Sequence, residues 1–155
     1  MFEELERLLT ARGARFRTIE HPPAGKSDEV ARIRGTEPGQ GAKAMLCKSK
    51  DDPPRFILAV LPGDRKLDFR KLAQALGLKK VTMASPEEAT RETGCAIGAI
   101  PPFSFSPQIE LVADPGLVRA YREIAFNAGR LDRSMVLDSQ DYLAIASPRL
   151  HPLCA

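Results

Sequence analysis

The sequence lacks any stretch that could cross a membrane. Its longest uninterrupted apolar run extends only from Phe56 to Leu61, whereas a membrane-spanning helix needs about 20 apolar residues. Tryptophan is absent, and aromatic residues make up only 6% of the 155 residues. We therefore expect no transmembrane segment and no membrane partner.

Cysteine and histidine are scarce and dispersed. The three cysteines, Cys47, Cys95 and Cys154, form no C-x-x-C pair. His21 and His151 lack the i, i+4 spacing of a helical zinc pair. These absences argue against a disulfide framework and a metal site, and we expect no metal and no other cofactor.

Neither sign of charge dominates the chain. Lysine and arginine number 23 against 20 acidic residues, and the net charge of +3 permits a nucleic-acid partner without requiring one. The segment Met1–Leu9 is acidic and amphipathic, unlike the basic start of a secretory signal. The cytoplasm is therefore the expected location.

What the sequence does contain is the pattern of one mixed domain over residues 1–155. Apolar residues make up 43% of the chain, enough for a core of its own. Apolar periodicity and capping residues predict helices over residues 2–12, 28–34 with Ser27 as its cap, 69–76, 86–93 and 139–146, with another helix after Asp114-Pro115. Strands are predicted over residues 42–48, 56–61, 79–84, 109–113, 123–127 and 134–137. Because the two types intermix without strict alternation, we expect an α/β (α+β) fold with a central, curved, mostly antiparallel mixed sheet.

Lys43 follows a glycine-rich segment that begins at Gly35. The segment is no phosphate-binding P-loop, because Ala42 separates Gly41 from Lys43 and a strand follows where a helix would be needed. The predicted strand is apolar on both faces, which places it near the core. From the local sequence, Lys43 is either a surface lysine at a strand end or a cation held in a cleft.

The loop from Gly94 to Pro107 is long, apolar and rich in small residues. It is either a buried connector or a loop whose backbone amides bind an oxygen ligand beside a small pocket. Its Ser104 lacks the context of a nucleophile. Outside the loop, His21 has a structural or a binding role, and Asn127 with Gly129 forms either a turn or part of a binding site.

These motifs, in their order and spacing, resemble the YbaK/ProX superfamily of free-standing relatives of the editing domain in bacterial prolyl-tRNA synthetases. They run through Glu20-His-Pro22, Gly41-Ala-Lys43, Val60-Leu-Pro-Gly-Asp64, Ala84-Ser-Pro-Glu-Glu88, Gly98-x-x-x-Pro102 and Asn127-Ala-Gly129. The resemblance covers about residues 15–145. The strings Ile33-Arg-Gly-Thr36, Gly98-Ala-Ile-Pro-Pro-Phe-Ser-Phe105 and Glu123-Ile-Ala-Phe-Asn-Ala-Gly129 are similar to the ProXp-ST-type deacylases of Ser-tRNA and Thr-tRNA.

The resemblance implies a metal-free trans-editing deacylase that binds the acceptor end of aminoacyl-tRNA, with a synthetase as a further partner. Lys43 matches the functionally important lysine of the family, and Gly98 belongs to its substrate loop. We assign these two residues to catalysis. Substrate binding is assigned to His21, Ala99, Ile100, Pro101, Pro102, Ser104, Asn127 and Gly129.

Two alternatives remain open at this point. One is a deacylase of the same superfamily that acts on Ala- or Cys-tRNA(Pro). The other is a non-catalytic module that binds tRNA or a synthetase. Many relatives also carry a threonine shortly after the His-Pro pair, where this chain has Ser27, which supplies a pocket hydroxyl or only caps a helix.

Overall fold

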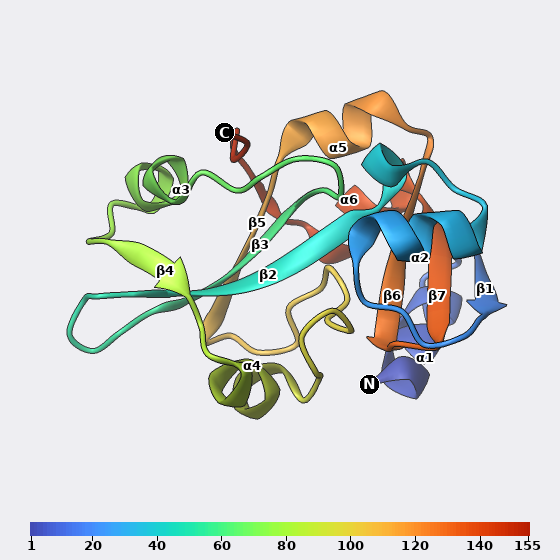
Figure 1. Ribbon diagram of the computed structural model, residues 1–155, viewed down its shortest axis with the longest axis horizontal. Coiled ribbons are helices and arrows are strands. Elements are labelled where there is room, and N and C mark those ends of the chain that lie inside the picture. Colours follow the sequence, from blue (N-terminus) through green and yellow to red (C-terminus); the bar gives the residue numbers. More distant parts are fainter.

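The computed structural model describes residues 1–155, whose strands form two sheets (Figure 1). In the smaller, antiparallel sheet, β7 (Arg133–Asp138) lies between β1 (Phe16–Glu20) and β6 (Glu123–Arg130). The sequence did not predict β1, because the side chains of this edge strand are only half-buried or exposed and show no apolar alternation.

The larger sheet is mixed. In spatial order its strands are β4 (Val81–Met83), β2 (Ala42–Ser49), β3 (Phe56–Pro62), β5 (Ile109–Ala113) and β8 (Arg149–Leu150). β2 pairs antiparallel with β3 and β4, whereas β5 pairs parallel with β3 and β8. The two-residue β8 is exposed, so its sequence carries no strand signal either.

The helices lie close to their predicted ranges. They are α1 (Phe2–Ala11), α2 (Ser27–Arg34), α3 (Phe69–Leu76), α4 (Pro86–Thr93), α5 (Pro115–Ala120) and α6 (Ser139–Ala146), with a short 3-10 helix η1 (Pro38–Gln40) that was not predicted. Ser85 and Glu88 form the predicted capping box at α4, and the Asp68 carboxylate caps α3. The prediction that Ser27 caps α2 is wrong, because the helix begins one residue earlier, at Ser27 itself, whose side chain makes no capping hydrogen bond. None of these helices has both the length and the apolar surface that a membrane span requires.

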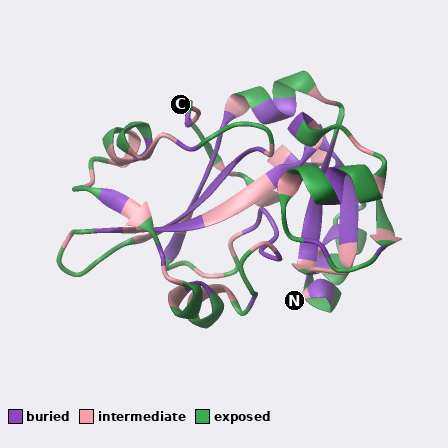
Figure 2. Cartoon of the chain, in the orientation of Figure 1, coloured by how far each residue is buried: buried purple, intermediate pink, exposed green.

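β3 separates two apolar clusters. Its residues from Ile57 to Leu61 are at most 1% exposed, so β3 is covered on both faces. The sequence predicted such a position for β2, which is only partly buried because its first half borders the pocket side of the sheet. Leu58 and Val60 point into a cluster of 24 buried residues, while the alternate side chains point into a second cluster of 9. Figure 2 shows the buried interior of the strands and the exposed outer faces of the helices.

The predicted mixed α/β fold is confirmed, with mostly antiparallel pairing in two sheets where one central sheet was expected. A single isolated bridge between Gly41 and Ala125 connects the sheets. The connection ends there because β2 then runs away from β6 alongside β3 (Figure 1). Beyond this bridge the two sheets separate, and the junction between them, which α2 borders, has no further strand pairing.

Candidate functional site

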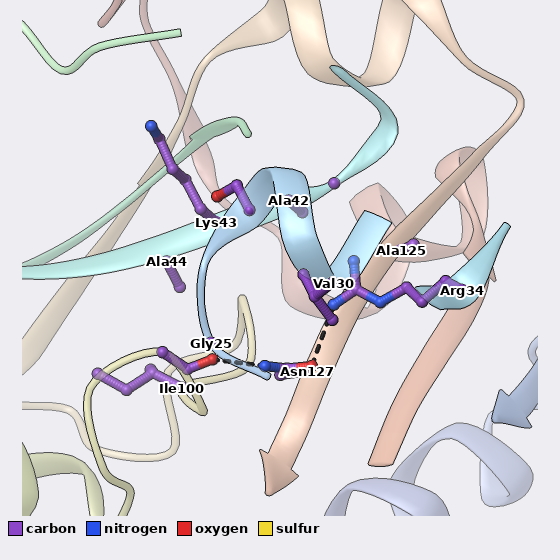
Figure 3. Close-up of a pocket in the computed structure, with 12 residues that line it drawn as sticks. Gly25, Val30, Arg34, Ala42, Lys43, Ala44, Ile100, Ala125 and Asn127 are labelled. Atoms are coloured by element: carbon purple, nitrogen blue, oxygen red, sulfur yellow. Dashed lines mark hydrogen bonds between the residues drawn. The ribbon is translucent and has the colours of Figure 1, made fainter. Parts of the chain in front are cut away.

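A pocket of about 430 Å³ opens where the two sheets meet (Figure 3). It is formed by the start of β2, the middle of β6, helix α2 and the loop that follows α4. Its lining consists of Gly25, Ser27, Val30, Arg34, Gly41, Ala42, Lys43, Ala44, Gly98, Ile100, Ala125 and Asn127. Two of these residues are cationic and none is acidic, so the pocket favours a ligand with negative charge.

Lys43 is the second residue of β2 and lies opposite Leu61 of β3. Its side chain is half-buried, and its ammonium group donates a hydrogen bond to the carbonyl oxygen of Arg65. Figure 3 shows the side chain extending away from Asn127. Burial lowers the pKa of Lys43, although the charge of Asp64 partly opposes this effect. The lysine is thus a strand-end cation without a carboxylate partner.

The loop after α4 approaches the pocket through Gly98. Its φ of +88° lies in the left-handed region, and a Cβ there would come within 3.2 Å of the Gly25 Cα. No residue of the chain accepts a hydrogen bond from the backbone N–H of Gly98 or of Ile100. The loop therefore combines a close backbone approach with two donors available to a ligand.

Residues of β6 hold this loop in place. The Asn127 side chain donates hydrogen bonds to the carbonyl oxygens of Ala24, at 2.9 Å, and Gly98, at 2.8 Å. The backbone N–H of Gly129 donates to the Ala99 carbonyl oxygen at 2.8 Å. Asn127 and Gly129, both predicted to bind substrate, thus set the position of the predicted substrate loop, and of the two only Asn127 lines the pocket.

A hydrogen-bond network continues behind Asn127. The hydroxyl of Ser134 lies 2.7 Å from His21 Nε2 and 3.1 Å from Asn127 Oδ1, and its single proton serves one of them at a time. His21 Nδ1 faces the Pro22 carbonyl oxygen at 2.8 Å and must carry a proton to make that bond. His21 is therefore connected to the pocket through Ser134 and does not line it.

Sequence reasoning missed Arg34. Its Nε donates to Ser134 Oγ at 2.7 Å and its Nη2 donates to Asn127 Oδ1 at 3.1 Å. Arg34 lies in the last turn of α2, where a basic residue is common because it interacts favourably with the helix dipole, so its position alone was no reason to single it out. The available signal was its i+4 spacing from Val30, which is 4% exposed, because that spacing puts both residues on one helix face.

The remaining predicted residues divide between two places. Pro101 and Ser104 line a neighbouring pocket with Ile100, and the Ser104 hydroxyl lies 2.8 Å from the Ile109 carbonyl oxygen. Ala99 and Pro102 line neither pocket, and the Pro102 carbonyl accepts a hydrogen bond from Tyr142 at 2.8 Å. The fold thus gathers Lys43, Gly98, Ile100 and Asn127, and leaves the rest of the loop farther away.

An apolar recess of about 620 Å³ adjoins the pocket and shares Ser27, Lys43, Gly98 and other lining residues with it. Its additional walls are Met45, Leu46, Met83, Ala84, Ala89 and Ile97. Met83 and Ile97 are 40% and 48% exposed, which is high for large apolar side chains. One continuous groove therefore has a polar, cationic end and an apolar end.

The groove contains one side-chain hydroxyl, that of Ser27, which has no hydrogen-bond partner in the chain, and it contains no thiol. Burial raises the pKa of the Cys47 thiol to about 12 and that of Cys154 to about 11, so neither is a ready nucleophile. No three side chains among histidine, cysteine, aspartate and glutamate are grouped to hold a metal ion. The arrangement is suited to binding an anionic group and polarising a carbonyl oxygen.

Comparisons with known proteins agree on one family. The family model described as "Aminoacyl-tRNA editing domain" matches residues 21–145. The multifunctional Ser/Thr-tRNA deacylase ProXp-y of Escherichia coli (strain K12) is 48% identical over 96% of this chain and 89% of that protein. A proline–tRNA ligase of Thermosipho melanesiensis is 32% identical over 65% of this chain, which corresponds to 17% of the ligase.

Solved structures share the fold. The structure of the hypothetical protein APE2540 superimposes with a TM-score of 0.87 at 22% sequence identity, covering 98% of this chain and 99% of that one. A candidate trans-editing enzyme for prolyl tRNA synthetase has a TM-score of 0.84 at 24% identity, covering 99% of this chain and 96% of that one. At these identities the structural likeness establishes the architecture alone.

Proposed function

The chain belongs to the family of aminoacyl-tRNA editing domains, and we propose that it hydrolyses the ester bond of mischarged tRNA, with Ser-tRNA and Thr-tRNA as substrates. It is an aminoacyl-tRNA deacylase, a hydrolase of carboxylic esters. The observation that carries this conclusion is the 48% identity to a Ser/Thr-tRNA deacylase over 96% of the chain. The cationic pocket at the sheet junction supports the proposal as the place of the reaction.

The reaction needs few protein groups because an aminoacyl ester is already activated. Water attacks the carbonyl carbon, negative charge develops on the carbonyl oxygen, and the bond to the ribose oxygen breaks as that oxygen takes a proton. The protein must position the water and stabilise the developing charge. No covalent nucleophile is required, which agrees with a groove that contains no thiol.

We assign to Lys43 the binding of the terminal phosphate or of the carbonyl oxygen by charge, and to the unpaired amides of Gly98 and Ile100 the binding of the ester. Lys43 contributes a cation whose only hydrogen-bond partner is a neutral carbonyl oxygen, so that substrate can replace this partner at little cost. The two amides lie in the loop that lines the pocket and have no acceptor in the chain. A neighbouring ribose hydroxyl of the tRNA assists in activating the water, as the family resemblance implies.

Substrate selection follows from the size and polarity of the pocket. Gly25, Ala42, Ala44 and Ala125 line the pocket without polar side chains, and we expect the amino-acid side chain that binds beside them to be small. The unpaired hydroxyl of Ser27 is available to bind a hydroxyl of the substrate. An alanyl side chain would leave such a group unpaired, at a cost of about 1–3 kcal/mol, so seryl-tRNA is preferred by about tenfold or more.

The direct test is kcat/KM for Ser-, Thr-, Ala-, Cys- and Pro-tRNA under one condition. We expect Ser-tRNA and Thr-tRNA to be hydrolysed fastest, and Ser27→Ala to reduce the preference for Ser-tRNA over Ala-tRNA. Ser147→Ala, which removes an exposed hydroxyl outside the groove, is the matched control. A clear preference for Ala-, Cys- or Pro-tRNA would contradict the substrate assignment, and binding without turnover of any substrate would contradict the enzymatic function.

We further propose that residues 1–155 act as one domain in the cytoplasm and receive substrate from an aminoacyl-tRNA synthetase. The support is that related sequences form part of proline–tRNA ligases. Adding the synthetase that makes the mischarged tRNA should raise the rate of clearance above that of the two proteins assayed separately. Equal rates would leave the deacylase function intact and remove the synthetase from the proposal.

A further inference from the structure

Arg34 is a half-buried cation that has no acidic partner. Its guanidinium group contacts two neutral groups, the Ser134 hydroxyl and the Asn127 amide oxygen. It takes part in none of the salt bridges of the chain. A charge withdrawn from water is costly unless an opposite charge compensates it. Burial accordingly lowers the pKa of Arg34, to about 10.

Part of the guanidinium group remains free. Arginine has five N–H donors, and Arg34 uses one on Nε and one on Nη2. Its Nη1 has no hydrogen-bond acceptor in the chain and lies 3.8 Å from the position that a Cβ on Gly41 would take. Every fully buried side-chain nitrogen has a partner, so this unpaired Nη1 is not fully buried, and both Arg34 and the neighbouring Gly41 line the pocket.

The hydrogen bonds to Ser134 and Asn127 fix the orientation of the guanidinium group and of its unpaired Nη1. Ser134 and Asn127, on two strands of the smaller sheet, accept the hydrogen bonds from Nε and Nη2 of Arg34, and Figure 3 shows the bond to Asn127. The guanidinium plane is thereby set before a ligand arrives, which reduces the entropy lost on binding. An arginine held in this way, in a pocket without acidic residues, is prepared for an anion.

We propose that Arg34 is an anion-binding residue of the pocket, whose Nη1 group receives a negatively charged oxygen of the aminoacyl-tRNA. This inference rests on the proposed function. The oxygen comes from one of two sources in the same substrate: the phosphate of the terminal nucleotide, or the carbonyl oxygen as it becomes an oxyanion. Lys43, on the other side of the pocket, binds whichever of these two oxygens Arg34 does not bind.

The first test compares Arg34→Lys with Arg34→Gln at equal thermal stability. Lysine keeps the charge, whereas glutamine keeps hydrogen-bonding capacity without charge. Anion binding predicts that the glutamine variant loses kcat/KM by about 100-fold and that the lysine variant stays at least tenfold more active than glutamine. Arg32→Ala, an exposed arginine on the same helix, is the control and should stay within about twofold of the unchanged protein.

The two sources of the anion give different kinetics. A phosphate contact raises KM on loss of Arg34 and reduces the slope of log KM against log salt by about 0.7. An oxyanion contact lowers kcat and leaves the salt slope unchanged. Added guanidinium ion at millimolar concentration should also restore part of the activity of Arg34→Ala, because it supplies the missing donors.

Two results would overturn the inference. One is a glutamine variant as active as the unchanged protein. The other is a glutamine variant at least as active as the lysine variant, with no recovery of Arg34→Ala by guanidinium, since this pattern indicates a purely structural role. Both results are interpreted only if the unchanged protein hydrolyses Ser-tRNA or Thr-tRNA. If the unchanged protein hydrolyses neither, the proposed function itself is contradicted.

Discussion

The side-chain amide of Asn127 donates a hydrogen bond of 2.8 Å to the backbone carbonyl oxygen of Gly98. The same amide group donates to Ala24, so one side chain of β6 holds both the segment before α2 and the loop after α4. The two residues are 29 positions apart in the sequence. The position of the substrate loop is therefore set by a strand of the other sheet.

Asn127→Ala should loosen this loop. The substitution leaves the carbonyl oxygens of Ala24 and Gly98 and one N–H of Arg34 without their partner. We expect a loss of about 1–3 kcal/mol in the free energy of unfolding and a lower kcat. Urea unfolding and deacylation rates measure the two effects. If activity is lost at unchanged stability, Asn127 contacts the substrate directly, as the sequence predicts.

Lys43→Ala should abolish most of the activity with little change in stability. The ammonium group has a single protein partner, the Arg65 carbonyl oxygen, whereas loss of one charge-stabilising donor costs about 100- to 1,000-fold in kcat. Lys50→Ala, an exposed lysine directly after the other end of β2, is the control. Deacylation rates and melting temperatures are the measurements. Full activity of the Lys43 variant would end its assignment to catalysis.

Gly98→Ala should impair both stability and activity. At a φ of +88° a side chain is strained by about 1–3 kcal/mol, and its Cβ would press on the Gly25 Cα at 3.2 Å. Gly77→Ala provides a matched control, because Gly77 also has a positive φ, of +63°, but no neighbour within 4 Å and no place in the pocket. The control should lose stability and keep kcat. Equal kcat in the two variants would mean that the loop is only a connector.

Thiol alkylation and metal chelation should leave the reaction rate unchanged. Burial raises the pKa of all three thiols, that of Cys47 to about 12, so little thiolate is present near pH 7. Activity after treatment with iodoacetamide at pH 7, and separately after exhaustive chelation, is compared with that of untreated protein. A chelator-sensitive rate that zinc restores would contradict the expectation that the enzyme uses no metal.

Acid should weaken the attachment of α4 to β2. The hydrogen bond from Lys48, at 2.6 Å, and the N–H of Ser85 lower the pKa of Glu88 from 4.5 to about 2. A lowered carboxylate pKa stabilises the fold above pH 4.5, and this contribution is lost as the pH falls from 4.5 toward 2. The difference in melting temperature between the unchanged protein and Glu88→Gln should shrink from pH 7 to pH 3. A constant difference would show that the pair is not coupled to folding.

Sequence reasoning succeeded where the signal is local. Asp68 and the Ser85–Glu88 capping box start helices because the capping bonds connect residues two or three positions apart. It also marked Lys43 and Gly98 through their match to the family's lysine and substrate loop, and both line the pocket, while their roles stay predictions. It failed at β1 and β8, where exposed edge strands have no apolar alternation to reveal them.

The sequence by itself determined most of the helices and strands and the residues that resemble those of an editing enzyme. Each of these follows from spacing along the chain, which fixes the faces of helices and strands. Only the tertiary structure decided which residues share the pocket. Arg34 and Asn127 are 93 positions apart, and their contact exists because two sheets meet at a single bridge beneath α2. Local patterns carry no information about such a contact, since its free energy arises only when both partners leave water together.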